Sequence, residues 1–318
     1  MIETIQIHLR KLALLHLQSR DVIITARDEN LKQQLQKLTP EQYLFWFQDQ
    51  DINGIESLNS APVHHTLDIA KTQLSNPPYG ILHSGEMLYR SSGSSGNLRV
   101  NHYFSWDNWL EYLIACSRGL MMFGVNSTDT IMTTDIGNLQ IGYRNIEDAA
   151  SLVWGAKVIK SGGTTWEEKL ELIQENSVTV LFANVTKLKR MGALIKDPNQ
   201  IKSLRFIVQL GEHLTDEDRE IIKNQFNVEV HNSYGSIEMG QISFTCSAGQ
   251  AHVHEDLVHI RTENNQSFFS KLVSLPIFNT SLSNESLTYS YKKQCECGSF
   301  LATIDEFRPR TGAINKKE

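Results

Sequence analysis

A serine- and glycine-rich segment at residues 90–97, R-S-S-G-S-S-G-N, is the first stretch of the sequence that could do chemistry. Backbone N–H groups in glycine-rich loops, together with small hydroxyl side chains, are suited to wrapping a phosphate group. The segment has neither the Walker lysine pattern nor the G-x-G-x-x-G dinucleotide pattern, and runs of Ser and Gly also serve as flexible linkers. Its composition leaves a phosphate-binding loop and a linker both open.

A second polar segment, N-S-Y-G-S-I-E-M-G at residues 232–240, directly follows a strand predicted over 228–231. Ligands of α/β proteins bind at the carboxyl ends of parallel strands. An aromatic ring, small hydroxyl residues and a carboxylate at that place could serve a base, a phosphate and a metal ion. The alternative is a plain surface turn in which Glu238 is already paired.

The last quarter of the chain holds three of its four cysteines, Cys246, Cys295 and Cys297, near His252 and His254. Three thiolates and one imidazole make a common closed set of ligands for structural zinc. The C-E-C-G turn would bring two of the thiols together, and strand alternation over 251–256 would point both histidines to one face. Either histidine could complete the set, and reduced thiols without a metal remain the alternative.

These segments lie in a chain that alternates helical and strand-like patterns, which predicts α/β architecture with a mostly parallel sheet. Residues 1–39 have helical periodicity. Thr215 is expected to cap a helix over 215–226. Trp106, Trp109 and Tyr112 recur at helical spacing and are predicted to pack in the core, with the wall of a substrate pocket as the alternative. After residue 240 the pattern changes to short strands, including 258–261 and 272–274, which predicts a smaller β-rich subdomain.

The composition excludes several classes of protein. The 318 residues are 40% hydrophobic and 21% charged, which is typical of globular proteins and not of disordered ones. The net charge of −6 gives no electrostatic reason to expect nucleic acid or an anionic membrane as a partner. No apolar run approaches the roughly 20 residues that span a bilayer, and the N-terminus lacks a signal-peptide pattern. We therefore expect a cytoplasmic protein.

The two polar segments, in this order and in this α/β pattern, resemble the adenylate-forming ligase superfamily, and most closely its phenylacetate–CoA ligase-like branch. Members carry a loop similar to S-S-G-T-T-G-K-P, then Gly-Glu after a strand, then a Y-G-x-x-E motif. This chain has the serine loop, Gly211-Glu212 and the Y-G-S-I-E sequence at 234–238. The resemblance covers residues 71–305.

The resemblance implies ATP- and Mg²⁺-dependent activation of a carboxylic acid, and it implies a role for each motif residue. Glu238 would bind Mg²⁺, Ser236 would contact the phosphate, and Tyr234 would stack near the adenine. Gly211 and Glu212 would border the adenine, Asn232 would contact its amino group, and Ser233 and Gly235 would belong to the same cofactor-binding segment. The leaving phosphates would be held by Ser91, Ser92, Gly93, Ser94, Ser95 and Gly96.

Members of the same branch also carry a Cys…Gly-x-x-His…Cys-x-Cys-Gly arrangement that holds structural zinc. The resemblance thus implies a Zn²⁺ site formed by Cys246, His252, Cys295 and Cys297.

Three departures from the family pattern bear on activity. The loop lysine is Asn97 here, with Arg99 as the nearest cation. The late aspartate that holds the ribose has no counterpart, so Asn284 or Glu285 would have to serve. We also expect that the small C-terminal lid domain of these enzymes is absent. Loss of a phosphate-binding cation in a low-dielectric site can lower the rate by orders of magnitude.

The predicted fold is the large N-terminal domain of adenylate-forming enzymes, with layered α/β subdomains and mostly parallel sheets, plus a small β-rich subdomain. We expect an N-terminal helical part at 1–89, a nucleotide-binding α/β core at 90–240, and a β-rich subdomain with the zinc site at 241–318.

The predicted function is adenylation of a carboxylic acid, aryl or arylacetic by resemblance, with release of pyrophosphate. The acyl group would pass to an amine, a thiol or a carrier protein. The alternative is a non-catalytic binding module, or a part-enzyme completed by a partner polypeptide. By the same resemblance the protein would form a homodimer.

Overall fold

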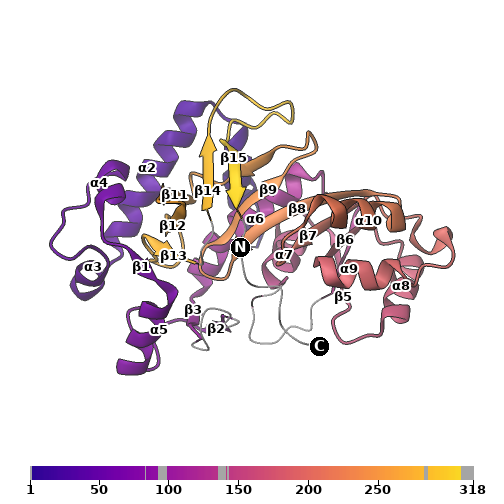
Figure 1. Ribbon diagram of the computed structural model, residues 1–318, viewed down its shortest axis with the longest axis horizontal. Helices are drawn as coiled ribbons and strands as arrows, with labels where there is room; N and C mark the ends of the chain where they lie inside the picture. The colour runs from indigo at the N-terminus through magenta and orange to yellow at the C-terminus, as the bar shows by residue number, and fades with distance from the viewer. Residues whose placement is uncertain are drawn as a thin grey trace. The chain divides into compact units, whose positions relative to one another are not determined.

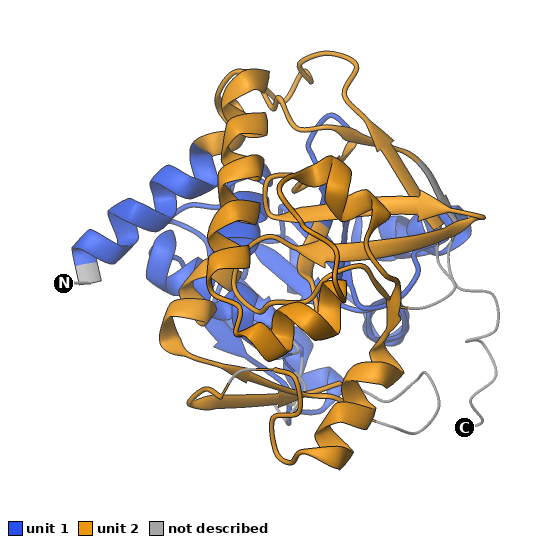
Figure 2. Cartoon of the chain, turned by 90° about the vertical axis from the view of Figure 1, so that its left-hand side faces the viewer, with its two compact units in different colours: residues 1–14, 113–235, 243–250 blue, residues 15–112, 236–242, 251–318 orange. Residues whose placement is uncertain are grey.

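The computed structural model describes residues 2–82, 84–91, 99–134, 141, 143–282 and 286–308. The chain folds into two compact units, and each unit is built from several separate stretches of the sequence (Figure 2). The first unit comprises residues 1–14, 113–235 and 243–250. The second comprises residues 15–112, 236–242 and 251–318.

Five parallel strands form the sheet of the first unit, in the spatial order β5-β4-β6-β7-β8 (Figure 1). In chain order they are β4 (Thr130–Thr133), β5 (Lys157–Lys160), β6 (Val180–Ala183), β7 (Phe206–Leu210) and β8 (Glu229–Ser236). β9 (Gly240–Thr245) follows β8 in the sheet. β4 and β6 are buried along their whole length, as expected for parallel strands covered on both faces.

Three helices, α8, α9 and α10, cover one face of this sheet. Their apolar side chains form one core with β4, β6, β7 and β8, and Leu170, Met191 and Phe226 are members of it. Each helix has a side-chain N-cap: Thr165, Asn184 and Thr215 accept backbone N–H bonds at their first turns. The helical segments of this unit are α1 (Ile2–Ala13), the second part of α6 (Trp106–Met122), α7 (Arg144–Asp148), η2 (Ala149–Val153), α8 (Trp166–Glu175), α9 (Val185–Gly192), η3 (Pro198–Ile201) and α10 (Asp216–Phe226).

The second unit contains three groups of paired strands. One runs in the order β1-β13-β12-β11, another pairs β10 with β15 and β15 with β14, and β2 pairs with β3. The strands are β1 (His64–His65), β2 (Met87–Arg90), β3 (Asn101–Phe104), β10 (Ala251–Val253), β11 (Val258–Glu263), β12 (Gln266–Lys271), β13 (Thr280–Ser281), β14 (Ser286–Ser290) and β15 (Thr303–Arg308). All these pairs are antiparallel except β1 with β13.

The helical segments of the second unit lie mostly in its N-terminal stretch. They are η1 (Leu14–Leu17), α2 (Arg20–Gln36), α3 (Pro40–Phe47), α4 (Ile55–Ser60) and α5 (Thr66–Ser75), followed by the first part of α6 (Trp106–Met122). None of the helices in the described part of the chain is long and apolar enough to span a bilayer.

The structure confirms the α/β architecture, and it confirms Thr215 as an N-cap, whose hydroxyl accepts the Asp218 N–H at 3.0 Å. The prediction of helix over 1–39 is wrong in its middle and at its end: α1 stops at Ala13, the 3₁₀ turn η1 covers Leu14–Leu17, and α2 runs from Arg20 only to Gln36. Helical periodicity continues through the break, which is why the sequence hides it.

Two further predictions need correction. The strand predicted over 272–274 does not form, because β12 ends at Lys271 and Ser274 has a left-handed φ of +69°. Its hydroxyl donates to the Asn108 carbonyl, so polar contacts replace the sheet ladder there. Of the three aromatic residues predicted in the core, Trp109 and Tyr112 are buried, but Trp106 is 57% exposed.

Candidate functional site

The serine loop is framed by an antiparallel strand pair. β2 runs into Ser91, and the ends of the loop are tied together because Ser91 N–H donates to the Val100 carbonyl and the Ser91 hydroxyl accepts from Val100 N–H, both at 2.9 Å. Arg99 is exposed. The other predicted phosphate-binding residues lie outside the described residues: Ser92, Gly93, Ser94, Ser95 and Gly96. Asn97, Asn284 and Glu285 do as well.

The carboxyl end of β7 lies beside the middle of β8, and this brings the predicted adenine-site residues side by side. β7 and β8 are parallel, and their register pairs Gln209 with Asn232 and Leu210 with Ser233. Gly211 follows at once with φ +84°, a conformation that glycine adopts at little cost. The carboxyl edge of a parallel sheet is where α/β proteins bind ligands, so this placement suits the predicted role.

Glu212 is held by another element. Its carboxylate accepts two bonds from Thr186 at the start of α9, from the backbone N–H at 2.8 Å and from the hydroxyl at 3.0 Å. Tyr234 and Gly235 belong to β8, which continues through residue 236. The motif therefore starts within the strand, and the turn comes only at 237–239.

That turn holds Glu238 in a buried position. The Ser236 hydroxyl accepts Met239 N–H at 3.1 Å, and the Tyr112 hydroxyl donates to the Ser236 carbonyl at 3.3 Å. Glu238 is only 7% exposed, and its Oε1 lies 3.7 Å from Nε2 of His102. Burial raises the pKa of Glu238, but His102 and local hydrogen bonds outweigh it and leave the pKa below its ordinary value. The site thus offers a buried, ionised carboxylate.

This carboxylate fits the magnesium role. Mg²⁺ prefers oxygen ligands and is commonly held by one or two carboxylates together with substrate phosphates. Among the described residues, Glu238 supplies such a ligand in the turn that ends the motif. Proteins tune the ionisation of buried carboxylates where they serve function, so the lowered pKa agrees with a binding role.

A stack of aromatic rings lies next to this turn, and two of its residues, Trp109 and Tyr112, were predicted in the core with a pocket wall as the alternative. Tyr89 stacks on Trp109 at 5.3 Å between centroids, and Trp109 stacks on Tyr112 at 5.6 Å. The buried ammonium of Lys271 lies 4.1 Å from the Tyr112 centroid. β12 reads Q-S-F-F-S-K, so a lysine at its end is not unusual in the sequence, and only the tertiary structure places Lys271 beside Tyr112.

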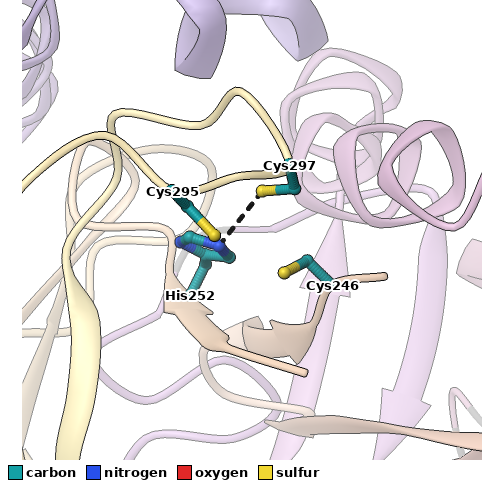
Figure 3. A group of neighbouring side chains, drawn as sticks. All are labelled: Cys246, His252, Cys295 and Cys297. Atoms are coloured by element: carbon teal, nitrogen blue, oxygen red, sulfur yellow. Dashed lines mark hydrogen bonds between the residues drawn. The ribbon is translucent and has the colours of Figure 1, made fainter. Parts of the chain in front are cut away.

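Three thiols and one imidazole meet in a second site (Figure 3). The ligand atoms of Cys246, His252, Cys295 and Cys297 all lie within 4.8 Å of one another, and Sγ of Cys297 is 3.4 Å from Nε2 of His252. A tight turn after β9 joins Cys246 to the strand of His252, since Cys246 N–H donates to the Gln250 carbonyl. His254, the competing imidazole, is not a member of the group.

Backbone hydrogen bonds close the turn that carries Cys295 and Cys297. Cys295 N–H donates to the Ser299 carbonyl, and Gly298, whose φ is +91°, donates back to the Cys295 carbonyl. In a tetrahedral zinc site the ligand atoms are about 3.5–3.8 Å apart. The group needs only a small contraction to reach that spacing, so its geometry and chemistry fit a closed structural zinc.

No protein-family model matches this chain, and no curated protein matches it in sequence. Solved structures do match in fold. The chain is similar to 2-hydroxyisobutyryl-CoA ligase in complex with 2-HIB-AMP and CoA in the thioesterification state, with a TM-score of 0.72 at 12% identity over 97% of this chain and 68% of that one.

An open conformation of that ligase, also with 2-HIB-AMP and CoA, gives a TM-score of 0.70 at 11% identity over 89% of this chain and 68% of that one. An ATP-bound RpMatB-BxBclM chimera gives 0.50 at 12% identity over 60% of this chain and 40% of that one. The chain therefore has the fold of the adenylate-forming ligases, which confirms the predicted fold. The phenylacetate–CoA ligase branch stays a prediction.

Proposed function

We propose that this protein activates a carboxylic acid with ATP, forming an acyl-adenylate and pyrophosphate. The observation that carries the proposal is the buried, ionised Glu238 in the turn that ends β8, in a chain with the fold of adenylate-forming ligases. In the reaction, an oxygen of the acid attacks the α-phosphorus. The bond from that phosphorus to the oxygen bridging to the β-phosphorus breaks, and pyrophosphate leaves.

The residues of the chain would share this work. Ser91 and the rest of the serine loop would hold the leaving phosphates, and Tyr234, with Gly211 and Asn232 beside it, would bind the base. Glu238 and Ser236 would face the phosphates. Mg²⁺, held by Glu238, would offset the negative charge that builds up on the phosphates. Arg99 is exposed and would be the cation that compensates for Asn97.

The acid is proposed to be aryl or arylacetic, and the acyl group to pass to an amine, a thiol or a carrier protein. The Cys246–His252–Cys295–Cys297 group is proposed to hold a structural zinc ion. Its four protein ligands leave no open position for substrate, so the metal would stabilise the fold and take no part in the adenylation.

The test is pyrophosphate release from ATP and Mg²⁺ over a panel of aryl, arylacetic and short-chain acids. The decisive variant is Glu238→Gln, which removes the charge but keeps the shape. Its matched control is Glu229→Gln, at the start of the same strand, where an exposed carboxylate pairs with Lys223. Release that depends on one acid, is lost in the first variant and persists in the second would support the proposal.

The alternative is a module that binds the nucleotide without reacting, and Asn97 at the position of the family lysine favours it. Calorimetric titration with ATP and Mg²⁺ separates the two functions. Binding that needs Glu238 but gives no pyrophosphate with any acid would favour the module. A folded protein that neither binds ATP nor releases pyrophosphate would refute both.

A further inference from the structure

A buried histidine lies beside the carboxylate of Glu238. His102 is in β3, which follows the serine loop, and strand alternation places it with Phe104 on the inner face. The side chain of His102 is fully buried, and Nε2 is 3.7 Å from Oε1 of Glu238. β3, the strand that follows the serine loop, therefore places His102 beside Glu238, the carboxylate of the Y-G-S-I-E motif.

Among the described residues, the His102 imidazole has no hydrogen bond that would explain its buried position. Within the part of the chain that the structure describes, neither ring nitrogen of His102 makes a hydrogen bond. A buried polar group without a hydrogen bond costs about 1–3 kcal/mol, so such groups rarely persist without a reason. The distance to Oε1 exceeds an ordinary N–H···O bond by about half an ångström. A small movement of the carboxylate would close it.

We propose that His102 is a positioning residue for Glu238: it donates its Nε2–H to one carboxylate oxygen and so directs the other oxygen to the divalent cation of the bound nucleotide. This inference rests on the proposed function. Carboxylates that bind metals are themselves held by hydrogen bonds from outer partners, and loss of such a partner costs about 10–100-fold in metal affinity.

Three variants test the role. His102→Leu removes the donor and keeps an apolar side chain in the buried space. His102→Gln keeps an N–H donor at a similar reach. Phe104→Leu serves as the matched control, since it lies two residues along the same strand, on the same inner face, and is equally buried. It loosens the packing without removing a donor to Glu238.

The measurement is binding rather than turnover. The probe is a non-cleavable α,β-methylene analogue of ATP, titrated calorimetrically with Mn²⁺ and again in a chelator. The ratio of the two dissociation constants gives the contribution of the cation. We expect His102→Leu to reduce this ratio at least tenfold, as Glu238→Gln does, while His102→Gln retains most of it and Phe104→Leu retains it fully.

An unchanged ratio in His102→Leu, with a wild-type ratio that depends on Glu238, would overturn the inference and leave the proposed function standing. Equal losses in His102→Leu and Phe104→Leu would also overturn it, because general loosening would then explain the effect. If His102→Leu does not fold, His102→Asn, which is too short to reach the carboxylate, must show the same loss. A wild-type protein that binds no nucleotide with Mn²⁺ would refute both proposals.

Discussion

Replacement of Gly240 by alanine should destabilise the protein through a specific clash. Gly240 has φ +77°, and a Cβ there would lie 3.1 Å from Cε2 and 3.3 Å from Cζ of Tyr112. That ring cannot move away easily. It is 3% exposed, stacked on Trp109 and met edge-on by Phe104 at 5.1 Å. The turn that carries Glu238 ends at Gly240, so a distorted backbone at Gly240 would also shift Glu238.

Two contributions set the expected magnitude. A left-handed φ costs a non-glycine residue about 1–2 kcal/mol. Overpacking a tight core adds about 1–3 kcal/mol. The Gly240→Ala variant should thus lose about 2–5 kcal/mol of unfolding free energy. Gly124→Ala is the matched control: its φ is +76°, but a Cβ meets no heavy atom within 4 Å, so only the backbone contribution remains.

Urea titration followed by circular dichroism measures both losses. A double-mutant cycle with Tyr112→Leu then isolates the clash, because the smaller side chain makes room for the new methyl group. We expect Gly240→Ala to cost about as little in that background as Gly124→Ala does in the wild type. Equal costs for the two glycine variants in the wild-type background, or a Gly240→Ala cost that Tyr112→Leu leaves unchanged, would refute the reasoning.

Two further predictions concern the metal group and a buried histidine. Elemental analysis of the purified protein should find about one zinc ion per chain. Cys297→Ser should lose this zinc and unfold at a lower urea concentration, whereas Cys116→Ser, which is not a member of the group, should keep it. Retention of zinc by Cys297→Ser would contradict the assignment. Burial, then the charges of Arg27 and Arg261, lower the pKa of His259 to about 4 from 6.5. The unfolded chain therefore binds the extra proton first, and stability falls as the pH drops from about 6.5 to about 4, by up to roughly 3 kcal/mol. His259→Gln, which can still donate to Asn59, should show a shallower fall than the wild type in urea titrations across that range, and identical pH profiles would count against it.

The sequence by itself determined the elements whose cause is local. Helix capping depends on a hydroxyl and a backbone N–H three residues away, so Thr215 could be identified without the fold. The buried strand β6 also shows in the sequence, because a strand covered on both faces has apolar side chains at successive positions. The likeness of the serine loop and the Y-G-S-I-E segment to a known family predicted the fold.

Only the tertiary structure decided which distant residues meet. His102 and Glu238 are 136 residues apart, and neither spacing nor periodicity relates them. The choice of His252 over His254 as the neighbour of the three thiols follows from the path of the turn between β9 and β10, because strand alternation alone treats the two histidines alike. Lys271, at the end of β12, and Tyr112, in α6, likewise meet only in the folded chain. Contacts of this kind depend on the packing of whole elements, and residue types along the chain carry no local signal for them.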